Sequence, residues 1–99
     1  MAHLKKILSE AIESIDTTTG LFYQQKNKEG YQSLNETLTI LIQTVDLISK
    51  TESENVKLNI DVHQINLFLE NAMKAMQQKD TILLSDILSF DIKNSLNNI

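Results

Sequence analysis

Apolar residues recur at alternating steps of three and four along most of the 99-residue chain. This spacing makes one side of an α-helix apolar and is the main sign of an amphipathic helix. The pattern breaks three times, at residues 24–30, 49–60 and 77–80, and residues 49–55 of the second break form the longest polar stretch. The pattern therefore predicts one all-α domain, residues 1–99, folded as an antiparallel up-down-up-down four-helix bundle. The helices are expected near residues 2–26, 28–50, 60–78 and 80–97.

The first two predicted helices carry regular apolar seams. The first seam turns polar at Thr18 and Gln25, so packing is expected to weaken beyond Ile15. Gly20 lowers helix stability by about 1 kcal/mol relative to alanine, so its presence inside the predicted helix indicates either a kink or a close helix crossing. The seams consist of Leu4, Leu8, Ala11, Ile15, Thr18 and Phe22, and of Tyr31, Leu34, Leu38, Leu41, Val45 and Ile48 at heptad spacing.

The segment just before the third predicted helix alternates apolar and polar residues, as a strand would. No second segment alternates to pair with it, so a strand would leave its backbone groups unsatisfied. Asp61, followed three residues later by a glutamine, resembles a capping box, and the helix is expected to begin there after an extended arm. A start near Asn55 is the alternative. Asp80 and Asn27 are the expected N-caps of the last and second helices.

The last predicted helix is apolar on nearly all sides. Such a helix is either the most central element of the bundle or meets another protein with one face. Asp91 falls at the centre of its apolar arc, where an unpaired carboxylate is costly to bury. Three interpretations are open: Asp91 caps a final short helix from Ile92, is buried and bonded to Tyr23, Tyr31 or a lysine, or lines a ligand pocket.

Other side chains are candidates for an interaction surface. Tyr23 and Tyr31 bracket the first predicted turn and are placed to cluster there, and aromatic residues of this kind are favoured at interfaces. Met73 and Met76 give the end of the third helix an adaptable surface, with ordinary core filling as the alternative. Phe90 belongs to the apolar arc of the last helix.

The composition excludes several kinds of chemistry. With no cysteine and only two glycines, the chain has no disulfide, no thiolate metal site and no known glycine-rich nucleotide loop. Neither histidine forms a Glu-x-x-His or His-x-x-x-His pair, so no metal and no cofactor are expected. His63, on the first turn of the third helix, is either a neutral, solvated side chain or an isolated general base. The chain is therefore expected not to be an enzyme.

Charge and hydropathy bear on partners and location. All 9 basic residues are lysines and face 13 acids, which gives a formal net charge of −4 and argues against a nucleic-acid partner. No apolar run approaches the roughly 18 residues that cross a bilayer, so no membrane partner is expected. Glu10 and Glu13 interrupt the stretch that a secretion signal would need apolar, which favours a cytoplasmic location.

Two segments carry a resemblance to known proteins. Gly20-Leu-Phe-Tyr before a polar turn, and Lys79-Asp80-Thr-Ile-Leu-Leu-Ser-Asp-Ile-Leu with a further acid at Asp91, resemble a group of short uncharacterised all-helical proteins of low-GC Gram-positive bacteria. This resemblance brings no catalytic residues with it. Size and acidity are also similar to those of the small helical export chaperones of bacterial flagella, which implies a chaperone-like role through fold class alone.

These observations favour a non-enzymatic helical interaction module, an adaptor or chaperone-like protein that binds another helix through a groove or through the outer face of the last helix. Two other hypotheses are kept. One is a small-molecule-binding bundle with an interior pocket near Asp91. The other is a purely structural protein that self-associates as a homodimer through the last helix.

Overall fold

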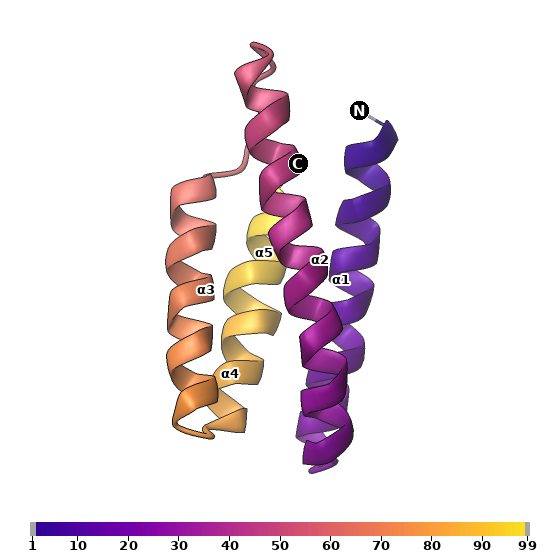
Figure 1. Ribbon diagram of the computed structural model, residues 1–99, viewed down its shortest axis with the longest axis vertical. Helices are drawn as coiled ribbons and strands as arrows, with labels where there is room; N and C mark the ends of the chain where they lie inside the picture. The colour runs from indigo at the N-terminus through magenta and orange to yellow at the C-terminus, as the bar shows by residue number, and fades with distance from the viewer. Residues whose placement is uncertain (1, 99) are drawn as a thin grey trace.

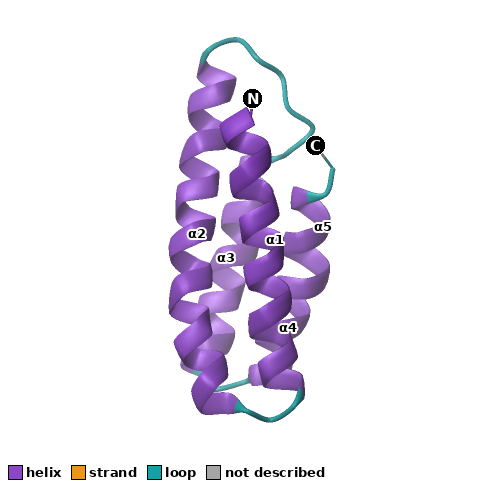
Figure 2. Ribbon diagram, turned by 90° about the vertical axis from the view of Figure 1, so that its right-hand side faces the viewer, coloured by secondary structure: helices purple, strands orange, loops and turns teal. Residues whose placement is uncertain are grey.

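The computed structural model describes residues 2–98, which fold into four helical rods lying side by side (Figure 1, Figure 2). The first three rods are α1 (Ala2–Tyr23), α2 (Asn27–Ser53) and α3 (Val62–Gln77). The fourth, the C-terminal rod, joins α4 (Thr81–Asp86), the π-helical segment η1 (Ile87–Ile92) and α5 (Lys93–Leu96). No strand occurs within residues 2–98. The prediction of an all-α chain with four helices is confirmed.

The rods form an elongated molecule of 43 × 22 × 18 Å. The connections after α1 and α3 lie at one end and the connection after α2 at the other, which is compatible with the predicted up-down-up-down order (Figure 2). α1 packs closely on α2, and the C-terminal rod contacts both α1 and α3, whereas α2 and α3 share few contacts. The C-terminal rod therefore joins α3 to the rest of the bundle.

Capping bonds account for two of the helix starts. The Asp61 carboxylate accepts a hydrogen bond from the Gln64 amide at 3.2 Å, and Asp80 caps α4 in the same way at 3.0 Å. Both predictions are confirmed, and a start of the third helix near Asn55 is wrong. The prediction for Asn27 is also wrong, because this residue is already the first of α2 and the position before it makes no side-chain capping bond.

The ends of α1, α2 and α3 are set by residues in the left-handed backbone region. Gln25, Asn55 and Lys79 have φ angles of 61°, 66° and 57°. After α1, the amides of Gln25 and Lys26 both turn back onto helix carbonyls at 2.9 Å, which is the Schellman pattern. Glycine usually takes the left-handed position, so these helices end on polar residues that accept some backbone strain.

The extended arm before α3 contributes to the core, as expected. Ile60 is buried, and Leu58 is half-buried against the core cluster. A long polar connection is thus held to the bundle by two aliphatic side chains. In Figure 1 the arm descends from the far end of α2 to the start of α3.

The α1–α2 interface is polar in its middle and still fully packed. Thr18 and Thr37 are buried, with their Oγ1 atoms 2.7 Å apart. The Ser33 hydroxyl lies 2.6 Å from that of Thr18, and the Ser14 hydroxyl lies 2.6 Å from that of Thr37. The expectation that packing weakens beyond Ile15 is wrong, because Phe22 is buried and the buried hydroxyls of Thr18 and Thr37 bond to each other across the two helices.

The two glycines have opposite surroundings. A Cβ at Gly30 would lie 2.7 Å from the ring of the buried Phe22, which itself meets Tyr31 edge-on with ring centroids 5.1 Å apart. A Cβ at Gly20 would meet nothing within 4 Å. The close helix crossing predicted at Gly20 is therefore wrong, and the close approach occurs at Gly30.

The two glycines make a matched test of this packing. Gly20→Ala is expected to raise the free energy of unfolding by about 0.5–1 kcal/mol, because alanine is the better helix former and space is open. Gly30→Ala is expected to lower it by about 1–3 kcal/mol, because the Phe22 ring must move. Urea unfolding followed by circular dichroism measures both, and similar effects at the two positions would contradict the packing described.

Candidate functional site

The C-terminal rod keeps one straight apolar edge against the core. Four of its buried residues follow one another at steps of four, with Ser85 and Ile87 buried beside them. In an α-helix each such step rotates the position by about 40° and would carry the edge away from the core. The edge consists of Leu84, Leu88, Ile92 and Leu96, all nearly inaccessible to solvent. The rod must therefore be wound more loosely than an α-helix over part of its length.

The π-helical segment η1 supplies this looser winding. A regular α-helical seam from Leu84 would place core positions at residues 88, 91 and 95. η1 accommodates one extra residue, so Ile92 and Leu96 take the core positions and Asp91 turns to the exposed surface. The π segment therefore explains the unusual position of Asp91 in the sequence: the looser winding keeps its unpaired carboxylate out of the core, where burial would be costly.

Two of the three interpretations of Asp91 are wrong. Asp91 is exposed rather than buried, and α5 begins at Lys93 with Ile92 before it and no side-chain capping bond. The carbonyl of Asp91 accepts a bond from the Ser95 hydroxyl at 2.9 Å. The side chain lines a groove of about 440 Å³ between α3 and the C-terminal rod, together with Asn71, Lys74, Ala75, Gln78, Leu83 and Ile87. This groove lies on the surface and neither tyrosine lines it, so it is not the interior pocket of the alternative, small-molecule-binding hypothesis.

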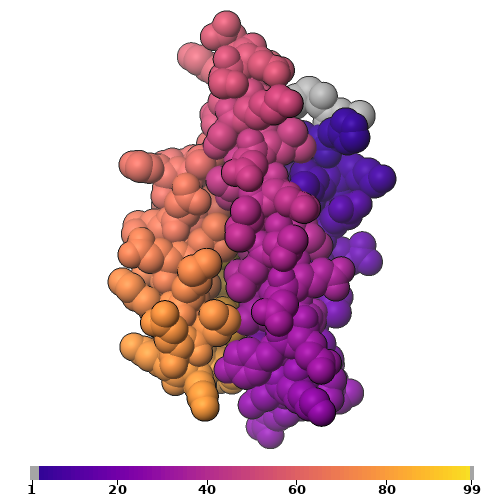
Figure 3. Space-filling view, in the orientation of Figure 1, coloured from indigo at the N-terminus to yellow at the C-terminus, as the bar shows by residue number. Residues whose placement is uncertain are grey.

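The outer side of the C-terminal rod carries exposed apolar side chains. Ile82, Asp86 and Phe90 are four residues apart, so they lie along one side of the rod with Leu83 beside them. Tyr23 adjoins them through its bond to Asp86. We call the apolar members the outer patch: Tyr23, Ile82, Leu83 and Phe90, exposed by 47%, 56%, 45% and 61%. The face in Figure 3 is covered mainly by α2 and α3, with the C-terminal rod almost hidden behind them.

Tyr23 ties the end of α1 to this patch. Its hydroxyl donates a hydrogen bond to Asp86 Oδ1 at 2.7 Å. Partial burial, and then the hydrogen bond and charge of Asp86, raise the pKa of Tyr23 above 10.0, while a bond with Ser89 lowers it. The predicted pairing of a tyrosine with an acid of the last helix therefore occurs, but the acid is Asp86 and not Asp91.

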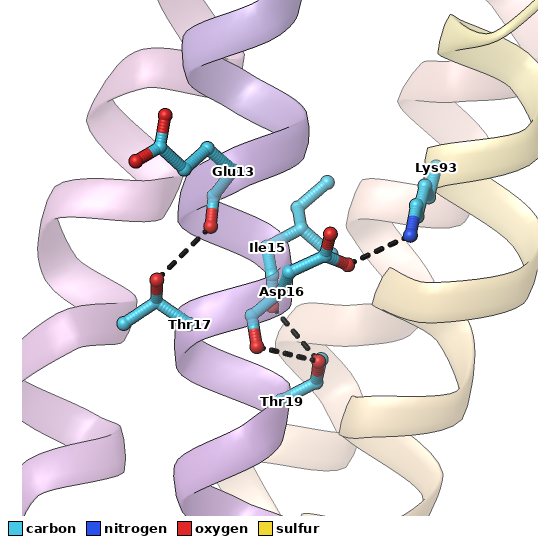
Figure 4. A network of polar contacts seen from close by, with 6 residues as sticks. All are labelled: Glu13, Ile15, Asp16, Thr17, Thr19 and Lys93. Atoms are coloured by element: carbon cyan, nitrogen blue, oxygen red, sulfur yellow. Dashed lines mark hydrogen bonds and ion pairs between the residues drawn. The ribbon is translucent and has the colours of Figure 1, made fainter.

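A second polar contact joins α1 to α5. Lys93 Nζ lies 2.8 Å from Asp16 Oδ1, as Figure 4 shows beside the hydroxyls of Thr17 and Thr19, which bond to carbonyls within α1. Lys93 is the only lysine of the C-terminal rod. Within residues 2–98, neither Asp86 nor Asp91 forms an ion pair, so the exposed side of the rod carries two carboxylates without a paired cation.

The remaining predicted side chains lie elsewhere. Tyr31 packs on Phe22 rather than on Tyr23, so the expected tyrosine cluster is wrong. Met76 is half-buried against the core, and Met73 is exposed on α3. His63 is exposed and borders a hollow of about 670 Å³ at the α2–α3 connection.

Three residues of the site were not singled out from the sequence. Ile82, Leu83 and Asp86 lie on the same side of the rod as Phe90. The steps of four from Ile82 to Asp86 and from Asp86 to Phe90, and of three from Leu83 to Asp86, would have indicated this from the sequence. Ser85 was also missed. It is fully buried, and its Oγ has no hydrogen-bond partner among the described residues.

Two further features, a metal-binding cluster and a helix that could span a membrane, are absent from the described residues. No group of three or more histidine, aspartate or glutamate side chains that would suit a metal ion occurs within residues 2–98. Over the same residues, no helix has both the length and the apolar character that a bilayer span requires.

Comparison with known proteins gives one match. A family model described as a domain of unknown function (DUF8042) matches residues 1–99. No curated protein matches the chain. No solved structure matches it either.

Deleting Asp91 tests the origin of the π segment. The deletion changes the core spacing to steps of four, three and four, which a regular α-helix satisfies. The variant is expected to fold cooperatively with an unfolding free energy equal to or above that of the parent, whereas deletion of Asn71 from α3 should lower it by several kcal/mol through loss of register. Thermal unfolding by circular dichroism distinguishes them, and a large loss of stability on deleting Asp91 would contradict this explanation.

The Tyr23–Asp86 bond predicts a pH effect. In a Tyr31→Phe background Tyr23 is the sole tyrosine, so phenolate absorbance reports its pKa directly, which is expected above 10.0. Asp86→Asn should lower it, because the charge that opposes phenolate formation is removed. Since the folded pKa is raised, the stabilisation is complete below pH 10.0 and is lost as the pH rises through the folded value. An unchanged titration in Asp86→Asn would count against the bond.

Proposed function

The chain belongs to the family described as a domain of unknown function (DUF8042), whose description assigns no activity, and we propose that it is a non-enzymatic helical interaction module. In this proposal an antiparallel up-down-up-down bundle presents the outer patch of the C-terminal rod to a helix of another protein. It acts in the cytoplasm as an adaptor or chaperone-like protein.

The observation that carries the proposal is the outer patch itself. Aromatic side chains present roughly 150–250 Å² each and aliphatic ones somewhat less, so these four at about half exposure leave roughly 400 Å² of largely apolar surface. Single exposed apolar residues, such as Ile42 on α2 and Leu67 on α3, are ordinary features of a protein surface. The largest apolar patch of a typical monomer covers about 300–600 Å² and is often functional, so a patch of this size on one rod supports an interaction site there.

The winding of the rod supports the same location. π-helical segments are rare and often mark functional sites, because an ordinary α-helix packs as well without them. Here the segment includes Phe90, the most exposed member of the patch, and Asp91 at the edge of the neighbouring groove. An extra residue that core packing does not need is consistent with selection acting on the exposed side.

Photo-crosslinking tests the proposal directly. A photoreactive amino acid at position 90 is expected to form one dominant cross-linked product in the cells that naturally produce the chain, with the attachment point in a helical segment of the partner. The matched control is position 67, which is similarly exposed at 55% but lies on α3.

The outcomes are distinct. A product specific to position 90 that contains a second protein supports the proposal, and one of twice the chain's mass shows self-association instead. Equal products from both positions, or none from position 90, would overturn it.

A further inference from the structure

The charges around the outer patch specify the kind of helix that would cover it, given the proposed function. Asp86 lies within the patch, between Ile82 and Phe90, and Asp91 borders the adjoining groove. Lys93 pairs with Asp16 at 2.8 Å, and Lys74, which lines the same groove, lies 3.9 Å from Glu70. We propose that the outer patch binds a basic amphipathic helix of another protein, whose apolar stripe covers the patch and whose lysines or arginines meet Asp86 and Asp91.

The geometry favours a helix as the occupant. Ile82 and Phe90 stand two turns apart along a straight rod, which matches the i, i+4, i+7 anchors of an amphipathic helix lying alongside it. The groove of about 440 Å³ next to Leu83 can receive side chains from that helix. A cation on its edge would gain a charge-assisted bond to a carboxylate that has no paired cation within the described chain.

A second copy of this chain fits less well. A symmetric pairing of two outer patches would bring like-charged carboxylates together near the axis, and such juxtapositions are costly. The patch of roughly 400 Å² is also about half of the roughly 800 Å² per partner that a stable interface covers. A cationic helix avoids the repulsion, and a small patch suits a single helix.

The π segment determines this surface. With Asp91 turned outward, a carboxylate borders the groove within one residue of the exposed Phe90 ring. A regular α-helix obtained by deleting Asp91 would retain the core but lose one of the two acids. The same extra residue that the core tolerates therefore supplies part of the specificity for a basic partner.

Two labelled peptides of about 18 residues, or five turns, serve as probes. Both carry a leucine stripe at helical spacing, with lysines on the edges of one and glutamates on the edges of the other. Fluorescence anisotropy against the purified chain is expected to show binding of the lysine peptide only. The double variant Asp86→Asn with Asp91→Asn should weaken it about three- to tenfold, and Phe90→Ser by about tenfold or more.

Matched variants elsewhere on the surface provide the controls. Asp46→Asn on α2 removes an exposed charge, and Leu67→Ser on α3 removes an exposed apolar side chain, so neither should change binding by as much as twofold. Deletion of Asp91 should weaken binding while leaving the fold intact. Circular dichroism of every variant confirms that helix content is unchanged.

The outcomes separate this inference from the proposed function. If both peptides bind alike and Phe90→Ser abolishes binding, the patch binds helices but has no preference for a basic one, and the inference is overturned alone. If Asp46→Asn weakens binding as much as the double variant, the attraction is to the acidic chain in general, which also overturns it. If neither peptide binds, the inference fails, and cross-linking at position 90 decides the proposed function separately.

Discussion

The C-terminal rod must hold one apolar edge against two neighbours at once, and the rest of the bundle depends on this. α3 meets the other helices chiefly through this rod, because α2 and α3 share few contacts. An edge with steps of four would turn away from the core in an α-helix, and both contacts would open. The π segment keeps Ile92 and Leu96 in line with Leu84, so a local change of winding maintains the tertiary arrangement.

The α1–α2 hairpin solves its packing differently. Its seam contains buried threonines where leucines would be expected, and their hydroxyls bond across the interface within 2.7 Å. Gly30 then lets the Phe22 ring lie directly on the α2 backbone. The hydroxyl bonds and the close contact at Gly30 are both possible in only one relative placement of the two helices. The geometry of this hairpin therefore depends on steric fit and hydrogen bonding as well as on apolar burial.

Helix boundaries could be predicted from interactions between residues close in the sequence. Features that depend on contacts between helices could not be predicted in this way. Asp61 and Asp80 cap their helices as expected, since a capping bond spans only three residues. The burial of Thr18 depends on Thr37, which lies on another helix, and the crowding at Gly30 depends on Phe22. Asp91 was predicted at the centre of the apolar arc because a rotation of 100° per residue was assumed for the whole rod. The π segment rotates less per residue, so this assumption places Asp91 and the residues after it on the wrong side of the rod. The outer patch was predictable only in part, through Tyr23 and Phe90.

The exposed side of the C-terminal rod offers a reason for the presence of the π segment. A chain one residue shorter would give the core a spacing that a regular α-helix satisfies, so we predict that the extra residue is neutral or unfavourable for stability. Its effect on the surface is specific, because it turns a carboxylate outward beside an exposed aromatic ring and next to a groove. If the extra residue does not stabilise the core, its effect on the outward-facing chemistry is the simplest reason for its presence, as we propose for this surface. The same insertion thus accounts for an anomaly in the sequence, an irregularity in the helix and the location of the proposed binding site.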